Sequence, residues 1–196
     1  MKYTTSKKID KKVNEYIEKI KNVIVGELNP ISIILIGGFG RGEGSFYKNE
    51  PFNDFDLYII ADKKISSKRL EEVGNLASSK IGKGGFEFME NSFEAYDKKK
   101  HFHVDIRCIE LKKLGKMMKT TRTFEIKNGS SVIYGKDLRP KIKITEKDLP
   151  IAEGFRHMIN KSCHLLLGMD SKRFNGHFIK DEKNMTIYWA IKTILA

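Results

Sequence analysis

Three aspartates in two short apolar segments are the residues of this chain best suited to chemistry. Asp54 and Asp56 open the segment DFDLYII, and Asp105 lies between apolar neighbours in HVDIRCI. On a strand, residues two apart point to the same face, so Asp54 and Asp56 would share one. Neighbouring carboxylates repel each other unless a cation lies between them. Their hard oxygen ligands select Mg²⁺ or Mn²⁺, and Asp105 would complete a site for two such ions. Weaker candidates for the third acid are Asp62, Asp97 and Glu110, which fall at strand ends or in loops.

A glycine-rich turn precedes the first two acids and could receive a phosphate. The apolar run 31–36 leads into GGFGRGE at 37–43. Because Gly37 and Gly38 lack a Cβ atom, their backbone N–H groups could approach an anion closely. A short helix after them would add a favourable dipole. The turn is not a P-loop, since Glu43 stands where that motif needs a lysine, and the dinucleotide fingerprint Gly-x-Gly-x-x-Gly has no complete match.

Basic side chains could complete the site, although each also has a structural interpretation. Arg41 could contact a phosphate, but with Glu43 two residues away it is better suited to bracing the turn. Lys161 lies on a predicted downstream helix, in a chain where lysine is frequent throughout. The remaining candidates are His101, His103 and Arg107, which alternation places on the face of Asp105, and Arg156.

The apolar pattern predicts the elements that would position these residues. Apolar residues at helical spacing indicate an amphipathic helix over 6–28, which Asn29-Pro30 ends. The continuous apolar run 31–36 has the length of a central strand buried on both faces. The other elements expected are strands over 55–61, 86–89, 102–109 and 131–134, helices over 66–79 (with Leu70, Val73, Leu76 and Ala77 on its apolar face), 111–119, 149–167 and 187–195, and a loop over 47–53.

Length, charge and cysteine usage bound the class of protein. The 196 residues suit one domain, or one domain with a partial second. The formal net charge of +12 could indicate a nucleic-acid partner, but the lysines are spread along the chain and would equally attract a nucleoside triphosphate. No apolar run approaches the roughly 20 residues of a membrane span, and the N-terminus lacks the apolar stretch of a secretory signal. Cys108 and Cys163 have no metal-binding spacing. We therefore expect a cytoplasmic protein without a membrane partner.

Together the motifs resemble those of the DNA polymerase β-like nucleotidyltransferase superfamily. The resemblance rests on GGFGRGE at 37–43, NDFDL at 53–57 and VDI at 104–106, and it is closest to the small bacterial and archaeal members. The segment VIYG at 132–135, followed by Asp137-Leu138, also resembles the end of their catalytic domain. Two departures stand out: Gly38 replaces a frequent serine, and the interval from there to Asp54 is longer than usual.

The resemblance implies a fold and a domain organisation. The fold expected is α/β (α+β), with a mixed, curved sheet backed by helices. It would form a nucleotidyltransferase catalytic domain over 1–145, including the N-terminal helix. A helical segment over 146–196 would follow, as part of a truncated second domain or as a surface that packs on a partner, a second copy of the chain included.

The resemblance also implies an activity. Two Mg²⁺ ions, with Mn²⁺ as the alternative, would be held by Asp54, Asp56 and Asp105. Gly37 and Gly38 would hold phosphates of an NTP, and Arg41 and Lys161 are the basic candidates. The enzyme would move an NMP, with ATP and AMP as the expected pair, to an acceptor hydroxyl and release pyrophosphate. A small molecule, a protein side chain and an RNA end remain open as acceptors. The rival interpretation is a catalytically weak regulatory or antitoxin-like module that keeps the fold for partner binding.

Overall fold

The computed structural model describes residues 1–47, 49–51, 54–83 and 103–167. These divide into two units: the first holds the described residues up to 146, and the second holds 147–167. The strand expected over 86–89 and the helix expected over 187–195 lie outside the described residues.

The first unit is built on a mixed four-stranded sheet, which makes the fold α+β as expected from the sequence. The strands lie in the order β5-β4-β1-β6. The strand β1 is antiparallel to both of its neighbours, whereas β4 and β5 are parallel. Their bounds are Ser32–Leu35 for β1, Phe55–Ala61 for β4, Val104–Glu110 for β5 and Ser131–Gly135 for β6.

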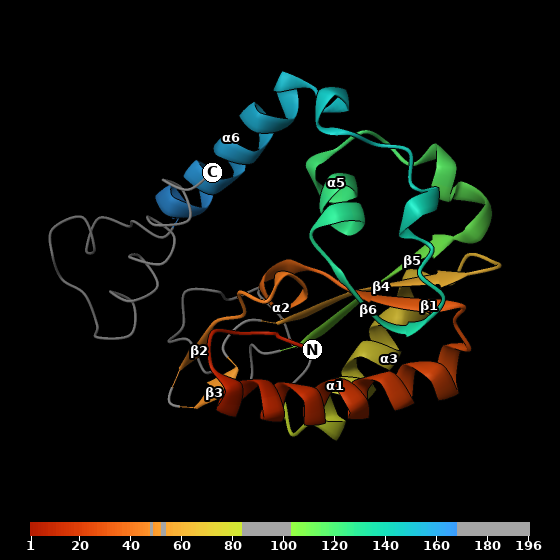
Figure 1. Cartoon of the computed structure of the whole chain (residues 1–196), viewed down its shortest axis with the longest axis vertical. Coiled ribbons are helices and arrows are strands. Elements are labelled where there is room, and N and C mark those ends of the chain that lie inside the picture. Colours follow the sequence, from red (N-terminus) through yellow and green to blue (C-terminus); the bar gives the residue numbers. More distant parts are fainter. Residues whose placement is uncertain (48, 52–53, 84–102, 168–196) are drawn as a thin grey trace, which may run out of the picture. The chain divides into compact units, whose positions relative to one another are not determined.

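One face of the sheet is covered by two helices, α1 (Lys7–Leu28) and α3 (Ser67–Lys80) (Figure 1). The helix α1 ends where the sequence predicts, because Asn29 adopts the left-handed conformation and its N–H bonds to the Val25 carbonyl. Together the helices and strands bury one apolar core, and its fully buried members include Ile9, Val13, Ile17, Ile20, Ile24, Ile33, Leu35, Phe55, Leu57, Ile59 and Val73. The strand β1 is buried on both faces, as predicted.

The helix α3 lies against the start of β5 at very short range. A Cβ atom on Gly74 would come within 2.6 Å of the Val104 carbonyl oxygen. The Ser78 hydroxyl donates to the Gly74 carbonyl at 2.8 Å and accepts from the Val104 N–H at 3.0 Å. The small residues Gly74 and Ser78 therefore form part of the buried face of α3, while Leu76, expected on that face, is 40% exposed. The prediction for Leu76 was wrong because α3 packs on the backbone of β5 through Gly74 and Ser78 instead.

The segment expected as a loop over 47–53 contains a small hairpin. Its strands are β2 (Phe46–Tyr47) and β3 (Glu50–Pro51), and Asn49 has φ of 62° at the turn between them. The Glu50 carboxylate is paired with Lys12 and accepts a hydrogen bond from the Tyr16 hydroxyl at 3.2 Å. These contacts tie the hairpin to α1, directly before the first candidate acid.

Between β5 and α6 the chain forms β6 and four shorter helical elements. The helix expected over 111–119 is instead a 3-10 helix, in which Leu114 is the buried residue. The helix α5 was not predicted from the sequence. The bounds are Leu111–Lys116 for η2, Thr121–Asn128 for α5, Arg139–Lys141 for η3 and Glu146–Asp148 for η4.

The second unit contains the helix α6 (Ile151–Leu167), which confirms the helix predicted over 149–167 to within two residues. Several of its described apolar side chains are exposed; Phe155, for example, is 58% exposed. Among the described residues, no helix is long and apolar enough to cross a membrane.

Candidate active site

The parallel pairing of β4 and β5 brings two of the candidate acids together. Asp56 and Asp105 are direct partners in the strand register, so their side chains point to the same face of the sheet. Phe55 and Leu57 point to the opposite face, where they are buried in the core. Asp54 lies one residue before β4, two residues from Asp56. The register thus confirms the predicted common face for Asp56 and Asp105, and Asp54 lies close enough to interact electrostatically with both.

The face that carries the acids changes from polar to apolar along the strands. Beyond Asp56 and Asp105, the next register pair on this face is Tyr58 with Arg107, followed by Ile60 with Ile109. Ile60 and Ile109 are buried. The acids thus lie at one end of the parallel pair, where the strands begin.

Two of the acids are held by neighbouring basic residues. The Asp105 carboxylate accepts hydrogen bonds from Arg107 Nε at 3.2 Å and Nη2 at 3.1 Å. The Asp54 carboxylate accepts one from the backbone N–H of His103 at 3.1 Å, and His103 Nδ1 lies 3.3 Å from the same oxygen. Both Arg107 and His103 were candidates from the sequence, and both lie at the acids.

Burial and mutual repulsion affect the ionisation of the two acids nearest the turn. The pKa of Asp54 is raised above its ordinary value of 3.8, chiefly by burial; His103 opposes this effect and Asp105 adds to it. The pKa of Asp56 is likewise raised, chiefly by burial; the attraction of Arg122 opposes this effect, and repulsion from Asp105, Asp54 and Glu125 adds to it. The acids are close enough to repel each other, so a cation between them would relieve a real electrostatic cost.

The glycine turn contacts the acids directly through Gly37. This residue begins the short helix α2 (Gly37–Arg41) with φ of +68°. A Cβ atom on it would lie 3.0 Å from Asp56 Oδ2. The absence of a side chain therefore lets the backbone of the turn lie against the Asp56 carboxylate.

Three hydrogen bonds fix the shape of the turn. The Glu43 N–H donates to the Gly38 carbonyl at 2.7 Å, and the Gly44 N–H donates to the Tyr3 carbonyl at 2.8 Å. On the other side, Ser131 Oγ donates to the Gly40 carbonyl at 2.8 Å. The N-terminal segment and β6 thus hold the turn in place.

The helix α5 adds two charged residues that the sequence did not reveal as site residues. Glu125 accepts a hydrogen bond from the Gly37 N–H at 3.2 Å and forms an ion pair with Arg41. Arg122 Nη1 lies 3.5 Å from the other Glu125 oxygen. The Thr120 hydroxyl, which accepts from the Thr123 N–H at 3.2 Å, caps α5; this capping residue was the available sequence signal for the helix.

The remaining candidates have different surroundings. Arg41 also donates to Glu43 at 3.1 Å, so in this structure it braces the turn. Lys161 lies on α6, in the second unit. His101 lies outside the described residues.

The donor set is of the type that binds a hard divalent cation, since it consists of carboxylates on one sheet face. Among the described residues, no three His, Cys, Asp or Glu side chains are arranged as ligands of a single metal ion. Arg107 and His103 hold two of the carboxylates. A bound cation would therefore replace these contacts and reorient the acids.

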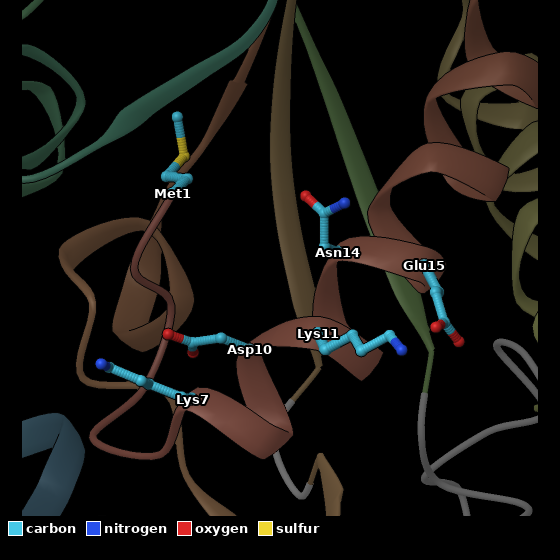
Figure 2. Close-up of a pocket in the computed structure, with 6 residues that line it drawn as sticks. All are labelled: Met1, Lys7, Asp10, Lys11, Asn14 and Glu15. Carbon is cyan, nitrogen blue, oxygen red and sulfur yellow. The ribbon is translucent and has the colours of Figure 1, made fainter.

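A separate hollow lies on the surface of the N-terminal part of α1 (Figure 2). Its Asp10 carboxylate already accepts hydrogen bonds from the backbone N–H groups of Tyr3 and Thr4, at 3.1 and 2.7 Å. Asp10 therefore anchors the N-terminal segment. The hollow is lined by Met1, Lys7, Asp10, Lys11, Asn14 and Glu15.

No protein-family model and no solved structure gives a significant match to this chain.

Proposed function

We propose that this protein is a metal-dependent nucleotidyltransferase, which moves an NMP from an NTP to an acceptor hydroxyl, with ATP as the first donor to test. The observation that carries the proposal is the register pair of Asp56 and Asp105, with the backbone of Gly37 against Asp56. Strand pairing holds two acids from distant parts of the chain at one place, and the glycine turn offers backbone donors beside them.

Each residue has a defined role in the proposed reaction. Asp54, Asp56 and Asp105 would hold Mg²⁺ or Mn²⁺, which neutralises the triphosphate and makes the α-phosphorus more electrophilic. Gly37 and Gly38 would orient the β- and γ-phosphates. Asp105 would favour loss of the proton from the acceptor hydroxyl. The hydroxyl oxygen then forms a bond to the α-phosphorus, the bond from that phosphorus to the bridging oxygen breaks, and pyrophosphate leaves.

The proposal extends to the fold and to the acceptor. The order of β1, glycine turn, β4 and parallel β5 supports a nucleotidyltransferase fold for the first unit. A small molecule, a protein side chain and an RNA end are all acceptors with a suitable hydroxyl. The net charge of +12 favours testing an RNA end among them.

The test is Mg²⁺-dependent pyrophosphate release from ATP, with cell extract as the source of acceptor. We expect Asp54→Ala and Asp56→Ala each to reduce this release to background while the circular dichroism spectrum is retained. Asp62→Ala is the matched control, because Asp62 is exposed and lies just beyond the far end of β4. Unchanged turnover in both site variants would refute the proposal. A partner-binding module without nucleotide chemistry would also gain little thermal stability from ATP and Mg²⁺ together.

A further inference from the structure

The carboxylate of Glu125 has the surroundings of a bound phosphate group. It accepts from the Gly37 N–H at 3.2 Å, forms an ion pair with Arg41, and lies 3.5 Å from Arg122 Nη1. The Glu125 side chain is 22% exposed, so these contacts are partly shielded from solvent. A backbone N–H and two guanidinium groups around one anion are a combination that proteins also use to bind phosphate.

The Gly37 N–H is available to an external acceptor because of its place in the chain. It belongs to the first residue of α2, where a backbone N–H has no partner within the helix. Glu125 fills this position from 88 residues away. The end of α5 lies on the turn: a Cβ atom on Gly129 would come within 3.4 Å of the Arg41 side chain. The docking of α5 thus delivers the carboxylate to the turn.

The position of Glu125 is also electrostatically unfavourable for the acids nearby. Its charge repels Asp56, and this repulsion contributes to the raised pKa of Asp56, although burial is the main cause. Arg122 acts in the opposite direction on Asp56. A triphosphate that replaced Glu125 would carry bound cations, which would offset its repulsion of Asp56, whereas the Glu125 carboxylate carries none.

We propose that Glu125 occupies the place of a phosphate group, and that a nucleoside triphosphate displaces it and takes over Gly37 N–H, Arg41 and Arg122. The proposal rests on the proposed function and adds Arg122 to the residues that bind the triphosphate. It also explains how Arg41 can brace the turn in the unliganded protein and still serve the nucleotide. Glu125 is then an internal competitor that weakens triphosphate binding.

The experiment is isothermal titration calorimetry of the full chain with Mg²⁺-ATP and, separately, with inorganic tripolyphosphate. Glu125→Gln removes the competing charge at constant size, so we expect both ligands to bind about three- to tenfold more tightly. Glu43→Gln is the matched control. It removes the same charge from the other partner of Arg41, a carboxylate that is 69% exposed, and we expect the Kd of this variant to change less than about twofold. Arg122→Gln should raise Kd about tenfold, also in the Glu125→Gln background.

The outcomes separate this proposal from the proposed function. If the wild-type protein binds Mg²⁺-ATP, but folded Glu125→Gln binds it no more tightly and Arg122→Gln has no effect, displacement of Glu125 is refuted and the nucleotidyltransferase proposal stands. If neither the wild-type protein nor Glu125→Gln binds either ligand, both proposals fail. Should Glu125→Gln not fold, Glu125→Asp takes its place, because its shorter side chain withdraws from Gly37, and the same tighter binding is expected.

Discussion

Gly37 meets two demands that no other residue type meets together. Its φ of +68° lies in the left-handed region, and its Cα is so close to Asp56 that a Cβ atom would lie 3.0 Å from the carboxylate oxygen. The first demand is conformational and the second is steric. A side chain at position 37 would therefore disturb both the backbone conformation of the turn and the position of the Asp56 carboxylate.

A substitution at this position should affect both stability and ligand binding. We expect Gly37→Ala to lower the free energy of unfolding by about 1–2 kcal/mol and to weaken Mg²⁺-ATP binding. Urea denaturation and calorimetry measure the two effects. Gly26→Ala is the control: Gly26 lies within α1 with open space around its Cα, so that substitution should raise the free energy of unfolding by about 0.5–1 kcal/mol. Equal effects of the two substitutions would contradict the steric argument.

The ionisation of Asp56 predicts how stability depends on pH. In the folded chain, burial first and the neighbouring acids next raise the pKa of Asp56 above 3.8. The folded protein therefore keeps this proton at pH values where the unfolded chain has lost it, and stability falls as pH rises from 3.8 through the folded pKa. Without divalent cations, Asp56→Asn should thus be more stable than the wild-type protein at pH 7, with a difference that shrinks as the pH is lowered.

Asp137 serves as a control because its pKa is shifted in the opposite direction from that of Asp56. The hydrogen bond from Arg139 lowers the pKa of Asp137 below 3.8, so its contribution to stability is present above that value and is lost as pH falls through the folded pKa. Asp137→Asn should therefore be less stable than the wild-type protein at pH 7. Urea denaturation of both variants over a series of pH values tests the pair. If both substitutions changed the free energy of unfolding at pH 7 in the same direction, the opposite pKa shifts of Asp56 and Asp137 would be contradicted.

The acids could be predicted from the sequence, whereas the residues of α5 could not. Asp56 and Asp105 are each flanked by apolar residues, and a period of two on a strand is a local property that fixes the face. Arg122 and Glu125 reach the turn only because α5 docks on it, which is a contact between distant parts of the chain. Nothing in the spacing of TRTFEIKN indicates that docking.

At the scale of elements, the junction of α3 and β5 determines where Asp105 lies. The Ser78 hydroxyl is the hydrogen-bond acceptor for the Val104 N–H, at the first residue of β5, and Ser78 itself is fully buried. Gly74 allows the strand to approach the helix at this point. The Ser78 hydroxyl and the absence of a side chain at Gly74 therefore position the first residue of β5, the strand that carries Asp105.

Removal of that hydroxyl should leave a buried backbone donor without a partner. We expect Ser78→Ala to lower the free energy of unfolding by about 1–3 kcal/mol, the cost of an unsatisfied buried group. Ser79→Ala is the control, because Ser79 is the exposed neighbour on the same helix, and its effect should stay within about 0.5 kcal/mol. Hydrogen exchange of the Val104 amide gives a second measurement. Slow exchange in Ser78→Ala would contradict the proposed bond.

The hairpin of β2 and β3 is an element that could not be predicted from the sequence. Its strands have two residues each, and Pro51 is a residue that disfavours a strand. The hairpin is anchored instead by Glu50, through Lys12 and Tyr16 of α1. Although burial alone would raise the pKa of Glu50, the hydrogen bond and charge of Lys12 hold it below its ordinary value. Anchoring of this kind depends on distant residues and has no local pattern.

At the scale of the whole molecule, the apolar core formed by the described residues lies in the first unit. Phe55 is fully buried there, with its ring centroid 4.8 Å from that of Phe39. Phe155, on α6 in the second unit, is 58% exposed. Two phenylalanines of the same chain thus have opposite environments.

This contrast predicts opposite sensitivities to the same substitution. We expect Phe55→Ala to lower the free energy of unfolding by about 3–5 kcal/mol, the range for large side chains removed from a core. Phe155→Ala should change it by less than about 0.5 kcal/mol. Both are measured by urea denaturation followed by circular dichroism. A loss of more than about 2 kcal/mol in Phe155→Ala would show that α6 is packed through its apolar stripe.

The parallel pairing of β4 and β5 has a consequence for the order of folding events. Parallel strands cannot be joined by a tight turn, and here the connection includes all of α3. Such long-range closures are slower than local ones. Asp56 and Asp105 therefore meet only when this closure occurs, so two carboxylates approach each other as β5 pairs with β4. The repulsion between them opposes that closure, so the feature that would give the protein its chemistry also slows its own assembly.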